Sequence, residues 1–99
     1  MDRNKEEILN RLQEHRDAIK AYGVRRLGLF GSFVRGEQKE TSDLDFVVEF
    51  EKKSFDSYMD LKQYLEDLFG CRVDLVISDA VKPRLRRMIL EEATHVPGL

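Results

Sequence analysis

Three aspartates have the side-chain type and spacing that a metal-dependent reaction requires. Asp43 and Asp45 are separated by one residue, and Asp74 lies within the apolar segment RVDLVI. Residues two apart on a strand point to the same face, so Asp43 and Asp45 are expected about 6–7 Å apart at their attachment points. Such carboxylates repel each other, and a hard cation such as Mg²⁺ compensates. If the strand of Asp74 lies beside theirs, a three-carboxylate cluster results.

A glycine–serine pair upstream of these aspartates is suited to binding an anion. Gly31 and Ser32 follow a predicted strand that ends at Phe30, and residues 33–36 can form one helical turn. Backbone N–H groups at such a junction converge on one point, and glycine lets an anion approach the backbone closely. The Ser32 hydroxyl can donate to a phosphate oxygen. We therefore expect a phosphate site at Gly31 and Ser32.

This loop has one feature of a P-loop, because Gly31 and Gly36 have the spacing of that motif. A P-loop continues with lysine and then serine or threonine. Here Glu37 and Gln38 occupy those positions. A carboxylate in place of the phosphate-binding lysine excludes the P-loop interpretation.

Each feature also has an ordinary structural explanation. A glycine–serine pair often forms a turn, an Asp-x-Asp often caps a turn or lies at a solvated edge, and one strand aspartate often faces solvent. The joint occurrence of all three, in this order and spacing, is much less easily explained in that way. Their combination therefore favours a functional site over three unrelated structural features.

The elements that must position these residues alternate between helix and strand. Apolar residues at steps of three and four predict helices over residues 3–22 and 58–68, each followed by a glycine that ends it. Pro83 predicts the first turn of a final helix. β-Branched and aromatic residues predict strands at residues 24–30, 44–50 and 72–77.

This order predicts an α/β (α+β) fold, a small mixed sheet of three to four strands packed with helices. The pattern does not decide the direction of the strands. The tail, residues 94–99, is expected to be extended. With 99 residues, the chain is expected to form a single domain over residues 1–99.

Composition narrows the possible environments and partners. The chain is 41% hydrophobic and 36% charged, without an apolar run near the roughly 20 residues that span a bilayer. The charged first residues lack a signal-peptide core, and Cys71 is the only cysteine, so we expect a cytoplasmic protein with no membrane partner. A net charge of −2 argues against direct nucleic-acid binding by charge alone. A domain this small leaves surface for a partner or a second copy of itself.

Several other residues have less specific interpretations. His15 lies on the apolar stripe of the first helix, and His95 has no positioned partner in the tail. The run 82–87 is the one basic cluster; by default it is a solvated helix face, but it could contact phosphate, RNA or an acidic partner. Phe55 and Tyr58 would suit a partner interface if exposed, although burial is the commoner fate of such residues.

The string GSFVRGE…TSDLDFVVEF resembles the DNA polymerase β-type nucleotidyltransferase superfamily. The motif of that superfamily is Gly-Ser, then Asp-x-Asp about a dozen residues on, then a third aspartate on a later strand. Gly31-Ser32, Asp43-x-Asp45 and Asp74 match it without a missing residue. The local forms G-S-x-x-R-G and S-D-x-D are those of the minimal nucleotidyltransferases, and the resemblance covers essentially the whole chain. It implies a polymerase β-like fold.

The resemblance also implies a metal and a nucleotide. Asp43 and Asp45 would bridge two Mg²⁺ ions, and Asp74 would hold the ion nearer the acceptor. Gly31 and Ser32 would bind the β- and γ-phosphates of an NTP, with ATP as the expected nucleotide donor.

Two further residues of the motif region are given roles by the resemblance. Ser42 would assist in phosphate binding. Arg35 would either contact phosphate or form an ion pair with Glu37 or Glu40, and the two alternatives are equally supported.

Members of the minimal group frequently accompany a helical HEPN-type toxin as its antitoxin, and some attach AMP to a tyrosine of that toxin. The resemblance therefore implies an Mg-dependent adenylyltransferase with a toxin hydroxyl as acceptor. One alternative is a binding module, catalytically weak or inactive, that neutralises the toxin by complex formation. A metal-dependent nuclease would share the carboxylates but would leave the Gly31–Ser32 loop without a purpose.

Overall fold

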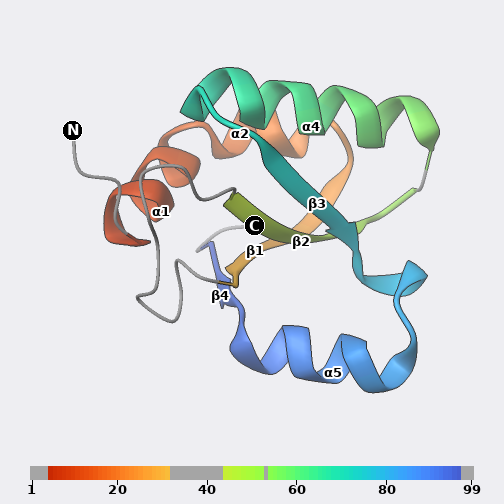
Figure 1. Cartoon of the computed structure of the whole chain (residues 1–99). Helices are drawn as coiled ribbons and strands as arrows, with labels where there is room; N and C mark the ends of the chain where they lie inside the picture. The colour runs from red at the N-terminus through yellow and green to blue at the C-terminus, as the bar shows by residue number, and fades with distance from the viewer. Residues whose placement is uncertain (1–4, 32–43, 53, 97–99) are drawn as a thin grey trace.

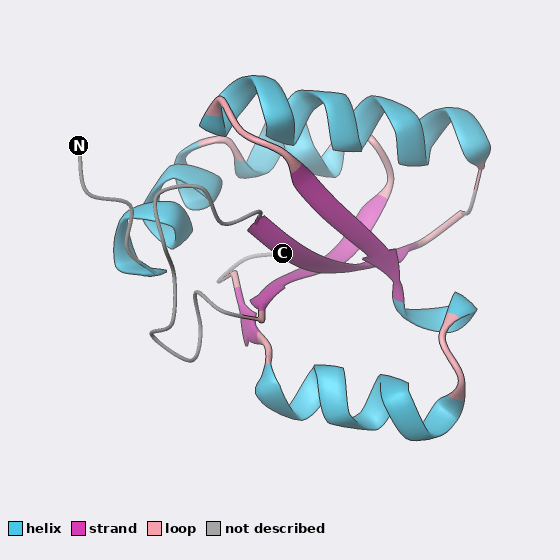
Figure 2. Cartoon of the chain, in the orientation of Figure 1, coloured by secondary structure: helices cyan, strands magenta, loops and turns pink. Residues whose placement is uncertain are grey.

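A computed structural model describes residues 5–31, 44–52 and 54–96 of the chain, which form a sheet with helices on both faces (Figures 1 and 2). The helices are α1 (Lys5–Glu14), α2 (Arg16–Lys20), α4 (Phe55–Phe69) and α5 (Pro83–Glu92), with a 3₁₀ turn, η1 (Ser78–Ala80), before α5. The strands are β1 (Val24–Phe30), β2 (Leu44–Phe50), β3 (Val73–Ile77) and β4 (Thr94–His95).

The sheet is mixed and has the order β3-β2-β1-β4. β1 is antiparallel to both β2 and β4, whereas β2 and β3 are parallel. The two parallel strands are connected through α4, which crosses over one face of the sheet (Figure 1). The predicted small mixed α/β sheet is therefore confirmed, and the structure adds the strand directions.

The tail predicted to be extended contributes the fourth strand. Thr94 and His95 pair with Leu29 and Gly28 of β1, and the Val96 N–H donates to the Leu27 carbonyl oxygen at 3.0 Å. Two residues are too few to show a strand pattern, so this edge of the sheet is not visible in the sequence.

One face of the sheet forms the hydrophobic core under α1, α2 and α4 (Figure 1). Side chains alternate along each strand, and the members that face the helices are fully or almost fully buried. They include Leu27, Leu29, Leu44, Phe46, Val48, Val73 and Leu75. The helices contribute Ile8, Leu12, Ile19, Leu61, Leu65 and Phe69. Burying one such side chain stabilises the fold by about 1.5–3 kcal/mol, so this face holds the sheet together.

The single helix predicted over residues 3–22 is wrong in one respect, because it is broken at His15 into α1 and α2. The His15 N–H is shared between the carbonyl oxygens of Arg11 and Leu12, both at 3.2 Å. The His15 ring Nδ1 also lies 2.9 Å from the Arg11 oxygen. The predicted apolar stripe is nevertheless correct, since Ile8 and Ile19 are buried on either side of the break.

Both ends of α4 are capped, and the C-terminal cap is the glycine expected to end this helix. The Ser54 hydroxyl accepts a hydrogen bond from the Ser57 N–H at 3.0 Å, and Gly70 ends the helix in the left-handed conformation with φ of 64°. No helix within the described residues is long and apolar enough to cross a membrane.

Candidate active site

Asp45 and Asp74 lie directly opposite each other on parallel strands. Asp45 of β2 pairs in register with Asp74 of β3, between the pairs Leu44↔Val73 and Phe46↔Leu75. Those flanking residues are buried in the core, so the two aspartates share the other face of the sheet. Adjacent strands are about 4.8 Å apart, which brings the two carboxylates to neighbouring positions. Asp45 is half-buried and Asp74 is exposed.

Gly31 brings the end of β1 against the Asp45 carboxylate. Phe30 pairs with Asp45 across the antiparallel strands, and Gly31 follows with φ of 82°, a conformation that favours glycine. A Cβ at Gly31 would collide with Asp45 Oδ2 and would lie 3.0 Å from its Cγ. Glycine is therefore required here both for the backbone conformation and for space. The start of the predicted phosphate loop and one carboxylate meet at this point.

Two side chains of α4 fix the backbone on both sides of Asp74. The Val73 N–H donates to Glu66 Oε2 at 3.1 Å, and the Tyr58 hydroxyl donates to the Leu75 carbonyl oxygen at 2.8 Å. β3 is an edge strand, so these bonds satisfy backbone groups that have no strand partner on that side. They also hold Asp74 at the register that faces Asp45.

The remaining predicted site residues, Ser32, Arg35, Ser42 and Asp43, lie outside the described residues. Within the described part of the chain, no group of three His, Cys, Asp or Glu residues is placed to hold a metal ion. What the structure brings together is the pair Asp45 and Asp74, with Gly31 beside it. Two adjacent carboxylates against a glycine backbone are a donor set that fits a hard, oxygen-binding cation such as Mg²⁺.

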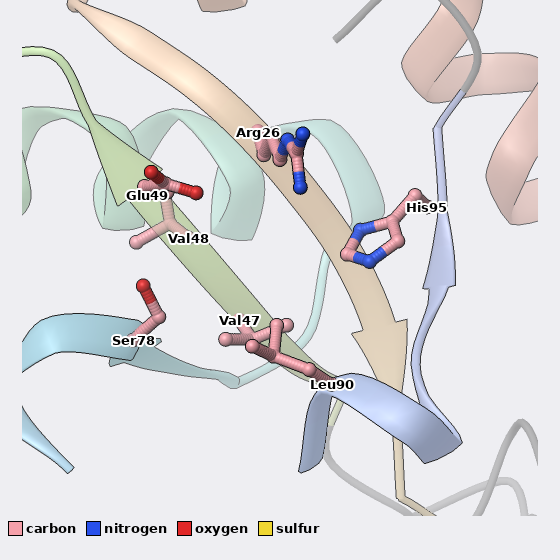
Figure 3. Close-up of a pocket in the computed structure, with 7 residues that line it drawn as sticks. All are labelled: Arg26, Val47, Val48, Glu49, Ser78, Leu90 and His95. Carbon is pink, nitrogen blue, oxygen red and sulfur yellow. The ribbon is translucent and has the colours of Figure 1, made fainter. Parts of the chain in front are cut away.

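A shallow hollow continues along the same face of β2 (Figure 3). Val47 and Glu49 follow Asp45 on that face, and the hollow has a volume of about 180 Å³ with the open solvent space included. Its lining residues are Arg26, Val47, Val48, Glu49, Ser78, Leu90 and His95. The carboxylate of one lining residue, Glu49, lies 3.7 Å from the Arg25 guanidinium.

Sequence reasoning identified neither the two α4 side chains nor this hollow. Glu66 and Tyr58 fall within an ordinary helical pattern, and their backbone partners are 7 and 17 residues away. The signal that could have found them is the unpaired edge of a strand, which becomes visible only when the strand order is known. In the sequence His95 has no positioned partner, whereas the structure places it over Gly28, where it lines the hollow.

Comparison with known proteins identifies a family for almost the whole chain. Residues 6–96 match the model of the nucleotidyltransferase domain. A protein adenylyltransferase, MntA, from Thermococcus cleftensis is 43% identical over 92% of this chain and 94% of its own length.

Solved structures have the same fold. A structure described as a minimal nucleotidyltransferase superposes with a TM-score of 0.72 and 41% identity, covering 87% of this chain and 93% of that one. A second match, with a TM-score of 0.65 and 17% identity, covers 92% of this chain and 73% of that one. It belongs to a complex of a tri-AMPylated Shewanella oneidensis HEPN toxin with an MNT antitoxin, and at this identity the likeness concerns the fold alone.

Proposed function

We propose an acceptor, a donor and a metal for this chain, which belongs to the nucleotidyltransferase domain family and is a nucleotidyltransferase. It transfers AMP from ATP to a hydroxyl group of a HEPN-type toxin, a tyrosine hydroxyl in particular, and thereby acts as the antitoxin. The observation that carries this proposal is the alignment of Asp45 with Asp74 beside Gly31. The 43% identical relative named as a protein adenylyltransferase supports AMP as the transferred group.

Magnesium is the proposed cofactor, as two ions held by the carboxylates of Asp43, Asp45 and Asp74. Asp43 and Asp45 would hold both ions, and Asp74 would hold the one nearer the acceptor. When bound, magnesium neutralises the triphosphate and lowers the pKa of the attacking hydroxyl. Asp74 is the more exposed of the two described carboxylates, which suits a position facing the incoming acceptor.

The reaction is a displacement at the α-phosphorus of ATP. A bond forms between the acceptor oxygen and the α-phosphorus while the bond from that phosphorus to the bridging oxygen breaks, and pyrophosphate leaves. The hydroxyl proton passes to a nearby base, for which the Asp74 carboxylate is suitably exposed. Holding donor and acceptor in line is the main contribution of such a site.

The phosphates are assigned to the loop that begins at Gly31. Because Gly31 has no side chain, the triphosphate can approach the carboxylates closely at this residue. The Ser32 hydroxyl donates a hydrogen bond to the β- and γ-phosphates. Ser42 assists them. Arg35 contacts a phosphate in this proposal, with the ion pair to Glu37 or Glu40 as the alternative. The cytoplasm, where ATP is available, is the proposed location.

Incubation with α-³²P-ATP, Mg²⁺ and a HEPN-type toxin as acceptor tests the proposal. The toxin should become labelled, and Asp45→Asn or Asp74→Asn should reduce labelling by at least about a hundredfold. Asp60→Asn, the same change at an exposed position of α4, is the matched control and should label at the wild-type rate. Absence of label with the wild type, or equal label with Asp45→Asn, would contradict the proposal.

The same variants separate catalysis from neutralisation by binding. An antitoxin that acts by complex formation would still suppress toxin activity when Asp45 and Asp74 are both asparagine. An adenylyltransferase would lose suppression with the label. Measuring toxin activity after co-incubation therefore distinguishes the two functions.

A further inference from the structure

The α5 helix leaves its apolar side chains largely in water. Leu85 and Met88 are 51% and 61% exposed, Leu90 is 37% exposed, and α5 contains no buried residue. A ten-residue helix is not stable alone and ordinarily depends on burying an apolar face. In α5 that face remains available to another molecule.

A polar anchor holds α5 in place of core packing. Arg86 Nε donates to the Ser78 carbonyl oxygen at 2.7 Å, and Arg86 Nη2 donates to the carbonyl oxygens of Asp79 and Val81, each at 3.3 Å. Hydrogen bonds from a charged donor stabilise by about 1.5–3 kcal/mol. The helix is thus held in position without the use of Leu85 and Met88.

The N-terminal part of α5 is positively charged. Lys82 and Arg84 form no ion pair with any residue that the structure describes, and the first turn of α5 contains no acidic residue. Arg87, by contrast, is paired with Glu91 at 3.2 Å. The positive end of the helix dipole adds to these two cations, so carboxylates on a partner would be attracted to this end.

The helix α5 and the candidate active site share one side of the sheet. Leu90 of α5 and Val47 of β2 line the same hollow, and Val47 is the next residue after Asp45 on that face (Figure 3). α4 lies on the opposite side, as Figure 1 shows, and carries Phe55 and Met59, the other two exposed large hydrophobic residues among those that the structure describes. A protein bound to α5 would therefore lie on the carboxylate side.

We propose that the exposed side of α5 formed by Arg84, Leu85 and Met88, together with Lys82 at the N-cap of the helix, is the surface on which the acceptor protein docks. This inference rests on the proposed function, and it specifies the partner surface: apolar side chains bordered by carboxylates. Leucine and methionine side chains between the charges suit a protein better than RNA, which would require aromatic side chains for base stacking.

The test compares two double variants against the HEPN-type protein as probe. Leu85→Glu with Met88→Glu should weaken the Kd by at least about tenfold, because each change places a charge in the apolar contact. The KM for the acceptor should rise by a similar factor, while kcat at saturating acceptor stays within about twofold. Phe55→Glu with Met59→Glu on α4 is the matched control and should leave Kd and KM unchanged. Glutamate favours helix, and the changed residues are exposed, so circular dichroism should be unaltered.

A charge reversal tests the same surface with its apolar side chains intact. Lys82→Glu with Arg84→Glu should also weaken the Kd, and the loss should shrink as salt is raised. Unchanged Kd in both α5 variants, or equal losses in the α4 control, would overturn the inference. The inference would also be overturned if the α5 variants lost binding to a labelled RNA but kept their affinity for the toxin. It would likewise be overturned if these variants changed the protein from a dimer to a monomer without changing its affinity for the toxin. If wild-type protein neither binds nor labels the toxin, the proposed function itself fails together with the docking surface.

Discussion

Gly31 is subject to two separate constraints at the scale of a single residue. Its backbone has a positive φ of 82°, and its missing side chain leaves space for the Asp45 carboxylate. Gly23 has nearly the same φ of 84° but nothing within 4 Å of an added Cβ. The two glycines therefore share the conformational requirement and differ only in the neighbour.

Alanine at each glycine separates these two effects. Gly23→Ala should lower the free energy of unfolding by about 1 kcal/mol, the usual cost of alanine at positive φ, with the transfer rate unchanged. Gly31→Ala should cost about 1–3 kcal/mol more and reduce transfer by at least about tenfold, because the Asp45 side chain must move. Urea unfolding and the labelling assay measure the two quantities. Equal effects of both variants would show that the contact with Asp45 is unimportant.

The carboxylate pair also makes a prediction about ion binding. Because Mg²⁺ binds the folded state alone in our proposal, a tenfold excess over its Kd should stabilise the protein by about 1.4 kcal/mol and raise the Tm by several degrees. Asp74→Asn should abolish this increase, whereas Asp60→Asn should preserve it. The measurement is a thermal melt with Mg²⁺ and with EDTA. A wild-type Tm that is indifferent to Mg²⁺ would exclude the proposed metal.

At the scale of elements, α4 both covers the core and sets the position of β3. Its Glu66 and Tyr58 side chains bond the backbone immediately before and after Asp74. Removing the Glu66 bond leaves the Val73 N–H without its acceptor and frees the start of the strand. Both bonds are therefore positioning contacts, which act through Asp74.

Glu66→Ala should lower kcat by about three- to thirtyfold and increase the Mg²⁺ concentration needed for half-maximal activity. Glu66→Gln keeps a side-chain oxygen acceptor and should recover most of both losses. Asp67→Asn, at the next and more exposed helix position, is the control. If Glu66→Ala changes stability but not the Mg²⁺ dependence, the bond is structural only.

The positions of the helices and strands were largely predictable from the sequence. Which strands lie side by side, and in which direction, was not. Strands 24–30 and 44–50 have the predicted bounds because alternation and β-branched residues are local signals. The alignment of Asp45 with Asp74 required β2 and β3 to be adjacent and parallel, and nothing in a periodic pattern states either fact. The break at His15 was missed for a related reason, since the ring bond to Arg11 depends on a side-chain conformation.

For the candidate site, the sequence supplies the residue types and the expectation that Asp43 and Asp45 share a strand face. That expectation and the roles of Asp43, Asp45 and Asp74 remain predictions. The close approach of Gly31 to Asp45 depends on the antiparallel register of β1 and β2, which only the fold provides.

At the scale of the whole molecule, the two faces of the sheet have different tasks. The face under α1, α2 and α4 is apolar and supplies the stability, while the face under α5 carries Asp45, Glu49 and Asp74. Charged groups can lie close together on the second face because the apolar core on the first face supplies most of the buried side chains. The free energy of unfolding should therefore depend mainly on groups packed under α1, α2 and α4.

Tyr64 of α4 packs against the core on the first face, and its pKa allows a pH test of how this face contributes to stability. Burial, and secondarily the nearby Tyr22, raises the pKa of the Tyr64 hydroxyl above its ordinary value of 10.0. The unfolded chain therefore loses this proton first, so the associated stability is complete below about pH 10 and is lost as the pH rises through the raised pKa. Tyr64→Phe should show a smaller fall in Tm between about pH 9 and 11 than the wild type. An identical fall in both proteins would show that other groups are responsible.

The parallel pairing of β2 and β3 has a consequence for the order in which the molecule assembles. Parallel strands cannot form a hairpin, so their contact requires closure of the chain through α4, a slow and non-local event. We therefore predict that Asp45 and Asp74 become neighbours only after the transition state for folding. An ion that needs both carboxylates should then leave the folding rate unchanged and slow only the unfolding rate. Such an ion would stabilise the native state kinetically.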